Sequence, residues 1–266
     1  MAKPLAYLCL TLPLLFSSAS TPTWASGERG LDESAFFAAR LLPSGLALGG
    51  TLGYGQLLWG ENSEGNVLFG YVRPSVTATT SVLLNRAEVG VDLFPVSFLG
   101  LYAGARGSQR AVDLDTLNCT SVYCRGLLGT AYLKPQLLLG YGPVSAMASF
   151  QTAWLVSSNS PSNSMMPFGD DVSNLAGNAG GDQLIGSELA VQVKLDPAFA
   201  TGTYLSTAHM LGSGSTNDLI SVFGRYLRGA LSYTAGVGAY ESTTQTRAFT
   251  CYGVVSWSGI AAMGLR

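Results

Sequence analysis

The sequence predicts an all-β protein: a transmembrane antiparallel up-and-down β-barrel of twelve strands, with ten strands as the alternative. Three observations favour this fold. They are a secretion signal at the N-terminus, a composition that is poor in charge and rich in apolar residues, and segments in which apolar and polar side chains alternate. We expect three parts in the chain: a signal peptide at residues 1–25, an N-terminal segment at residues 26–42 and the barrel at residues 43–266.

The first 25 residues form a compositional unit of their own. Lys3 supplies a positive charge, an apolar run follows at residues 5–16, and small residues precede a cut after Ala25. This is the layout of a secretory signal peptide. A transmembrane helix needs about 20 apolar residues, and this run is too short. We therefore expect cleavage after Ala25 and export of the remainder.

The composition does not fit a soluble protein. Charged residues make up 11% of the chain and apolar residues 47%, whereas about 25% charge is typical of soluble proteins. After residue 25 there is still no uncharged apolar stretch of the roughly 18 residues expected for a membrane-spanning helix. Membrane-spanning strands explain both the high apolar content and the lack of a long apolar stretch, because only alternate residues of each strand face the bilayer. The net charge of −2, with no basic stripe, argues against a nucleic-acid partner.

Residues 86–94 show the alternation most clearly. Four apolar residues share one face of the predicted strand: Ala87, Val89, Val91 and Leu93. Three charged residues share the other face, because successive side chains of a strand point to opposite sides: Arg86, Glu88 and Asp92. The pattern recurs, with varying regularity, in residues 46–58, 68–76, 99–110, 127–139, 144–156, 189–195, 220–226, 231–237 and 255–265.

The direction of these faces follows from the cost of placing a charge in lipid. An Arg or Lys at the midplane of the bilayer costs about 2–4 kcal/mol, so the apolar faces are expected outside and the charged faces inside. A soluble β-sandwich or a lipocalin-like barrel is the alternative. Predicted strands of 11 to 16 residues favour the membrane, since about 5–6 residues are usual in soluble sheets.

Ten charged side chains are therefore expected inside the barrel: Arg73, Arg86, Glu88, Asp92, Arg106, Arg110, Lys134, Glu188, Lys194 and Arg225. Seven are positive and three are negative, which leaves an excess of four positive charges. If the interior is open, this excess favours anions modestly. In the alternative, the charges pair across strands and fill a narrow, plugged barrel.

The connections alternate between short and long. The short ones lie at residues 94–97, 141–143, 196–198 and 227–229, and the long ones at 113–124, 157–182, 212–217 and 241–248. Transmembrane barrels have short periplasmic turns and longer outer loops, so the last strand is predicted to run towards the periplasm. Eleven strands are clear, and the twelfth is expected at residues 32–43. That segment fits a short helix capped by Asp32 or Ser34 equally well.

Three cysteines remain after processing: Cys119, Cys124 and Cys251. Cys119 and Cys124 lie close together in a predicted loop and can form a small disulfide in an oxidising compartment, while pairing with Cys251 stays open. No metal site and no cofactor are predicted, because His209 is the only histidine and there is no Cys-x-x-Cys motif. The acids of the longest loop, Asp170, Asp171 and Asp182, are interpreted as solvated.

No catalytic residue is predicted. Lipid hydrolases built on barrels use a serine and a histidine on one strand, with the histidine taking the serine proton. Ser206 and His209 are three positions apart and therefore point to opposite faces, and Leu211 stands where a serine would be needed. His209 is expected inside the barrel or at its rim.

On this pattern and the signal peptide, the chain resembles the broad class of bacterial outer-membrane β-barrel proteins over residues 43–266. The resemblance implies a location in the outer membrane, contact with the lipid bilayer and insertion by the barrel-assembly machinery. Members commonly end in a strand with a terminal aromatic residue. Here the chain ends in Arg266, and only Trp257 and the alternation of Met263 and Leu265 retain part of that signal.

The function expected on this basis is that of a small passive pore or a plugged structural barrel. Surface binding or adhesion through the long outer loops is the alternative, and the Gly-, Ser- and Asn-rich composition of these loops neither supports nor excludes it. A lipid-modifying hydrolase is the less favoured alternative. The sequence names no permeant solute and no external ligand.

Overall fold

The computed structural model describes residues 29–42, 45–61, 68–81, 84–111, 113, 117–157, 167–170 and 172–259. The predicted signal peptide and the last seven residues lie outside this range. The described part contains no helix long and apolar enough to cross a bilayer. Its barrel strands are β1 (Arg29–Arg40), β2 (Gly45–Trp59), β3 (Gly70–Thr80), β4 (Leu84–Val96), β5 (Leu99–Arg110), β6 (Gly126–Tyr141), β7 (Val144–Ser157), β10 (Gly181–Lys194), β11 (Phe199–Met210), β12 (Thr216–Arg228), β13 (Leu231–Ser242) and β14 (Gln245–Ser258).

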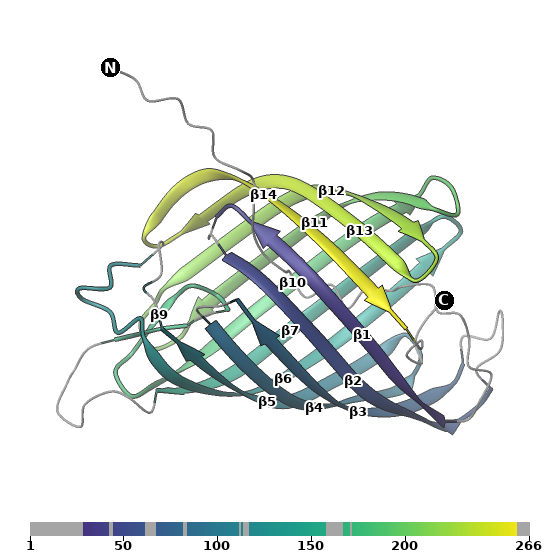
Figure 1. The fold of residues 1–266 in the computed structure, drawn as a ribbon, viewed down its shortest axis with the longest axis horizontal. Helices are drawn as coiled ribbons and strands as arrows, with labels where there is room; N and C mark the ends of the chain where they lie inside the picture. The colour runs from purple at the N-terminus through teal and green to yellow at the C-terminus, as the bar shows by residue number, and fades with distance from the viewer. Residues whose placement is uncertain are drawn as a thin grey trace, which may run out of the picture.

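These twelve strands of the described residues close into one antiparallel barrel, which confirms the predicted fold class and strand number. Each strand pairs with its neighbours in the chain, and β1 pairs with both β2 and β14. Figure 1 shows β1 in purple beside β14 in yellow, where the two ends of the sheet meet. Closure leaves no unpaired edge strand.

The segment that fitted a helix or a strand is strand β1. Its even positions face inwards and include Asp32 and Arg40, which are both buried, whereas Leu31 and Phe37 are exposed on the other face. This alternation has the period of a strand, and Ala38 lies opposite Ala47 on one side and Val254 on the other. The helical alternative for this segment is therefore wrong.

The two faces of the barrel differ as the alternation predicted. Val89 is 57% exposed on the outer face, while Arg106 on the inner face is only 7% exposed. Among described strand residues, a few charged side chains point outwards, and all of them lie near strand ends: Arg29, Glu33, Asp218, Arg228, Glu241 and Arg247. Between them runs an uncharged apolar band around the described barrel.

The connections define two ends of the barrel. The short-turn end holds the turns after β4, β6, β10 and β12, the longer connection between Trp59 of β2 and Gly70 of β3, and the described chain ends at Arg29 and Ser258. The long-loop end holds the connections at residues 111–125, 158–180 and 211–215. Exposed aromatic side chains are numerous on the outer face near the short-turn end: Trp59, Tyr141, Phe199, Tyr226, Tyr233 and Trp257. Such girdles are typical of the membrane–water interface.

One predicted loop is wrong. Residues 241–248 were expected to form a long connection, but β13 and β14 are joined by a two-residue turn at Thr243 and Thr244. The polar residues around it pair as strand: Tyr240 lies opposite Ala248, and Ser242 opposite Gln245. The Thr243 hydroxyl also accepts a hydrogen bond from the backbone N–H of Thr216 at 2.7 Å. Polar residues at a strand rim resemble a loop in sequence, which explains the error.

Candidate functional site in the barrel interior

The interior is the candidate site because it collects the charged side chains. The structure places all ten sequence-predicted lumen residues on the inward faces of their strands. Two further charges lie inside, Asp32 and Arg40 of β1, whose strand the sequence left undecided. These two have opposite sign and cancel, but the buried Asp170 of the longest loop and Asp182 on the inward face of β10 also lie inside, which lowers the excess of positive charge among the described interior residues from four to two.

The strongest polar contact lies near the short-turn end, where Arg73 of β3 bridges two aspartates. Its Nε and Nη2 donate to the carboxylate of Asp32 at 2.7 and 2.5 Å, and its Nη1 donates to Asp92 Oδ2 at 2.7 Å. All three side chains are largely buried. The guanidinium lies directly over Gly53 of β2, where an added Cβ would come within 2.6 Å of Arg73 Nε. A side chain at this position would push the guanidinium away from its present place.

Further polar contacts cross the middle of the interior. Lys134 Nζ donates to Glu188 Oε2 at 2.6 Å, and the Ser149 hydroxyl donates to the same oxygen at 3.0 Å. The Tyr132 hydroxyl donates to Glu88 Oε1 at 2.8 Å, and the guanidinium of Arg106 lies 5.8 Å from the centre of the Tyr132 ring. Such a position suits a cation–π contact. Much of the predicted charge is thus paired or packed across strands.

The remaining predicted charges are more scattered. Arg225 Nε donates to the Ser232 hydroxyl at 3.0 Å near the short-turn end. Lys194 is exposed at the end of β10. Arg86 faces inwards opposite Ser108, and Arg110 lies buried at the long-loop end.

Aromatic side chains fill much of the space that the charges leave. Near the short-turn end, Tyr71 and Phe94 stack with their ring centres 4.5 Å apart, and Tyr102 meets Phe94 edge-on at 5.6 Å. A second cluster lines β11–β14 and contains Tyr204, Leu219, Phe223, Tyr240 and Tyr252. Sequence reasoning missed these clusters, because inward aromatic residues count as apolar in the alternation and leave no separate signal.

The longest loop folds against the inner wall at the long-loop end. Its short strands β8 (Phe168–Gly169) and β9 (Ala176–Gly177) form a small sheet. Phe168 and Leu175 are 3% and 2% exposed. They belong to one cluster with inward side chains of four barrel strands: Leu128, Ala153, Leu155, Leu184 and Met210. The described part of this loop therefore folds into the barrel rather than away from it.

Asp170 is buried and Asp182 is half-buried at the start of β10, which corrects the interpretation of these acids as solvated. Asp170 is fully buried, and its Oδ2 accepts hydrogen bonds from the N–H and the hydroxyl of Ser173. The Asp182 carboxylate accepts backbone N–H bonds from Asn178, Gln183, Gly212 and Ser213. Both acids accept hydrogen bonds that hold turns in place. Asp171 lies outside the described residues.

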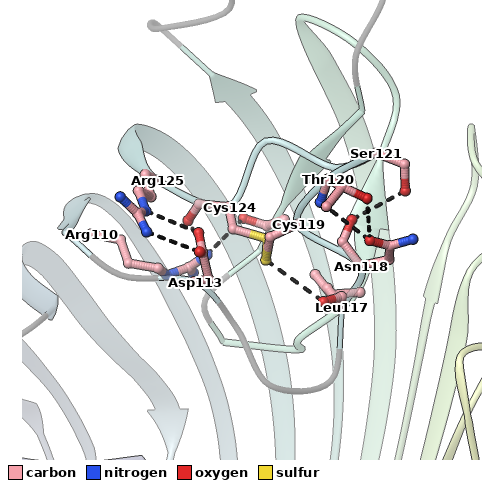
Figure 2. Close-up of a disulfide and its surroundings, with 10 residues drawn as sticks. Arg110, Asp113, Leu117, Asn118, Cys119, Thr120, Ser121, Cys124 and Arg125 are labelled. Carbon is pink, nitrogen blue, oxygen red and sulfur yellow. Dashed lines mark hydrogen bonds and ion pairs between the residues drawn. A yellow bond between two sulfur atoms is a disulfide. The ribbon is translucent and has the colours of Figure 1, made fainter.

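The predicted disulfide between Cys119 and Cys124 is present in the connection after β5 (Figure 2). Cys251 lies on the outer face of β14, away from this loop. The buried Arg110 donates through Nη1 to the carbonyl oxygen of Cys124 at 2.8 Å and to that of Gly169 at 3.4 Å. Near the base of the loop, Asp113 and Arg125 form a bidentate ion pair with both contacts at 2.9 Å.

We predict that low pH loosens the base of this loop. The hydrogen bond from Arg125 lowers the pKa of Asp113, so the folded loop favours the ionised carboxylate. This stabilisation is present above the ordinary aspartate pKa and is lost as the pH falls through the lowered value. A spin label at Ser121 should become more mobile only as the pH falls through this lowered value, below the ordinary aspartate pKa of about 3.9. In Asp113→Asn the label should be mobile at pH 7 already, with no further pH response. A pH-independent wild-type signal would contradict the prediction.

The structure separates the one serine–histidine pair that the sequence raised. Ser206 lies on the inward face of β11, while His209 shares the outer face with Leu205 near the long-loop rim. The two side chains cannot form a dyad from opposite faces of a strand. Among the described residues, no group of three or more His, Cys, Asp or Glu side chains is placed to hold a metal ion.

No protein-family model matches the chain, and no curated protein matches its sequence. Several solved β-barrel structures are similar to it at low identity and TM-score. An outer-membrane channel from Pseudomonas putida F1 is 9% identical with a TM-score of 0.48, over 97% of this chain and 100% of that one. The porin NanC is 6% identical with a TM-score of 0.43, over 86% and 100% of the two chains. The β domain of the Bordetella autotransporter BrkA is 9% identical with a TM-score of 0.43, over 88% and 100%. At these values the likeness concerns architecture alone.

Proposed function

We propose that the protein is an integral β-barrel of the bacterial outer membrane that acts as a small, anion-preferring pore and is closed in the conformation described. The membrane location is supported by the uncharged apolar band around the outside of the barrel and by the charged side chains inside it. Burying such a band in lipid is favourable, whereas exposing a band of this extent to water favours aggregation. The long-loop end then faces outwards and the short-turn end faces the periplasm.

The closed state follows from the filled interior. Aromatic clusters, the Arg73 bridge and the inward-folded loop occupy successive levels of the barrel between its two ends. The anion preference follows from the interior charge excess, since a lumen lined by one sign of charge attracts counter-ions of the other sign. We infer a non-catalytic role, because Ser206 and His209 face opposite sides of β11.

Planar-bilayer recording tests the pore. We expect refolded protein to give low conductance with brief openings. Under a potassium chloride gradient, the reversal potential of these openings should have the sign expected when chloride carries more current than potassium. The control for a folded barrel is gel electrophoresis, in which heated and unheated samples of a folded barrel migrate differently. A membrane that stays sealed with folded protein would exclude the pore and leave a structural barrel. A cation-selective current would exclude the anion preference.

A further inference from the structure

The long-loop end of the barrel is covered by two segments that contact each other. One is the disulfide loop, described at residues 117–125, and the other is the β8–β9 segment, described at residues 167–170 and 172–177. We propose that these segments, here called the mouth lid, form a gate for the interior, and that the Cys119–Cys124 disulfide keeps the gate shut. This inference rests on the proposed function, because it concerns how the same interior is closed.

The β8–β9 segment supplies the part of the lid that enters the barrel. Phe168 and Leu175 insert among inward side chains of β6, β7, β10 and β11, and Leu155 beneath them is 1% exposed. Burying two apolar side chains of this size strongly favours the inserted position. They also cover inner-wall residues that would otherwise meet water at the open end of the barrel.

The disulfide loop holds the β8–β9 segment in this position. Tyr123 donates its N–H to the Pro167 carbonyl at 2.7 Å and accepts the N–H of Gly169 at 3.0 Å, so that two hydrogen bonds flank Phe168. Cys124 is the next residue after Tyr123, and its carbonyl accepts from Arg110 of the barrel wall. Figure 2 shows Arg110 reaching towards Cys124 beside the disulfide. The disulfide therefore restricts the two residues that connect Phe168 to the wall.

The far side of the lid also makes hydrogen bonds to a neighbouring connection. The Ser213 hydroxyl donates to the Ala176 carbonyl at 2.5 Å, and the Asn217 side chain donates to the Ser173 carbonyl. These contacts come from the β11–β12 connection and the start of β12. Hydrogen bonds exposed at a rim break far more easily than a covalent bond. Hydrogen bonds therefore hold the β8–β9 segment on both sides, and on one side the loop that provides them is stiffened by the disulfide.

Positive charge lies beneath the lid. Arg110, Arg86 and Arg106 occupy successive inward levels of β4 and β5, since Arg86 lies opposite Ser108 and Arg106 opposite Glu88. Lifting the lid removes the two carbonyl acceptors, on Cys124 and Gly169, from Arg110. The opened mouth would then present a guanidinium to small anions such as chloride or phosphate.

Cysteine accessibility tests the lid without relying on current. In a Cys251→Ser background, Leu155→Cys places a thiol under Phe168, and a water-soluble sulfonated maleimide reports how often the lid opens. We expect the double variant Cys119→Ser/Cys124→Ser to raise the labelling rate at least about tenfold, because a disulfide restricts the open ensemble more than the closed one. Phe168→Asp should raise it similarly. Ser121→Ala, on the exposed side of the same loop, is the matched control and should leave the rate unchanged.

The outcomes separate the lid from the pore. Equal labelling rates in all folded variants would overturn the lid. Faster labelling, with bilayers that stay sealed for the same variants, would support the lid and exclude the pore. Faster labelling together with longer anion-selective openings would support both. Heat-modifiable gel mobility identifies the variants that are folded and can be compared.

Discussion

Replacing Arg73 by methionine should lower the free energy of unfolding by about 3–5 kcal/mol, the usual cost of removing one partner from a buried ion pair. The variant leaves the carboxylates of Asp32 and Asp92 facing each other in the interior. Both are largely buried, and Arg73 donates to each of them in the described structure. Urea unfolding of the protein from detergent micelles or thin bilayers, followed by tryptophan fluorescence, measures the difference.

A matched pair of variants shows whether charge is the cause. Asp32→Asn/Arg73→Met/Asp92→Asn removes the whole bridge, and its stability should lie within about 1–2 kcal/mol of wild type, because no buried charge is left unpaired. Lys194→Met removes a positive charge from the exposed end of β10 and should change stability by less than about 0.5 kcal/mol. If Arg73→Met has no larger effect than Lys194→Met, the bridge does not stabilise the barrel.

The faces of the strands could be predicted from sequence because alternation is a local property. A bilayer excludes charge from the outward positions in the middle of a strand, so charged and apolar residues alternate between neighbours such as Glu88 and Val89. The faces can therefore be assigned without knowing which strands pair in the closed barrel. The same reasoning fails at strand ends, where Glu241 and Arg247 face outwards in a polar region and the pattern was interpreted as a loop.

The contacts inside the barrel could not be predicted in the same way. Arg73 meets Asp32 and Asp92, which lie 41 and 19 residues away in the sequence. Which inward residues meet depends on strand register, and register follows from turn lengths and bulges that a single sequence does not specify. Asp32 was overlooked because its segment fitted a helix as well.

Buried loop acids were missed for a related reason. Asp170 stands in a stretch rich in Ser, Asn and Gly, which by composition alone indicates a solvated loop. Its burial comes from Phe168 and Leu175, which pack into the barrel on either side of it. A hydrogen bond from Ser173 then satisfies one of its oxygens. The disulfide was easier to predict, because its cysteines are separated by five positions within one connection.

Replacing Val89 by arginine should destabilise the protein by about 2–4 kcal/mol in a bilayer. Val89 lies near the middle of β4 on the outer face and is 57% exposed in the isolated barrel. In lipid that exposure is contact with hydrocarbon, so a guanidinium there loses its hydration. Unfolding by urea from phospholipid vesicles measures the change, with wild type refolded in the same vesicles as the reference.

The control for this change is Gln109→Arg on the neighbouring strand. Gln109 is also outward and exposed, but it is the second-last residue of β5 at the long-loop end, where an arginine reaches the interface and costs only about 0–1 kcal/mol. In detergent micelles, whose thickness adapts to the side chain, the difference between the two variants should shrink. A soluble barrel would tolerate arginine equally well at both positions, since both face water. Equal stability of Val89→Arg and Gln109→Arg in vesicles would therefore exclude the membrane location, and with it the proposed pore and the gate at its mouth.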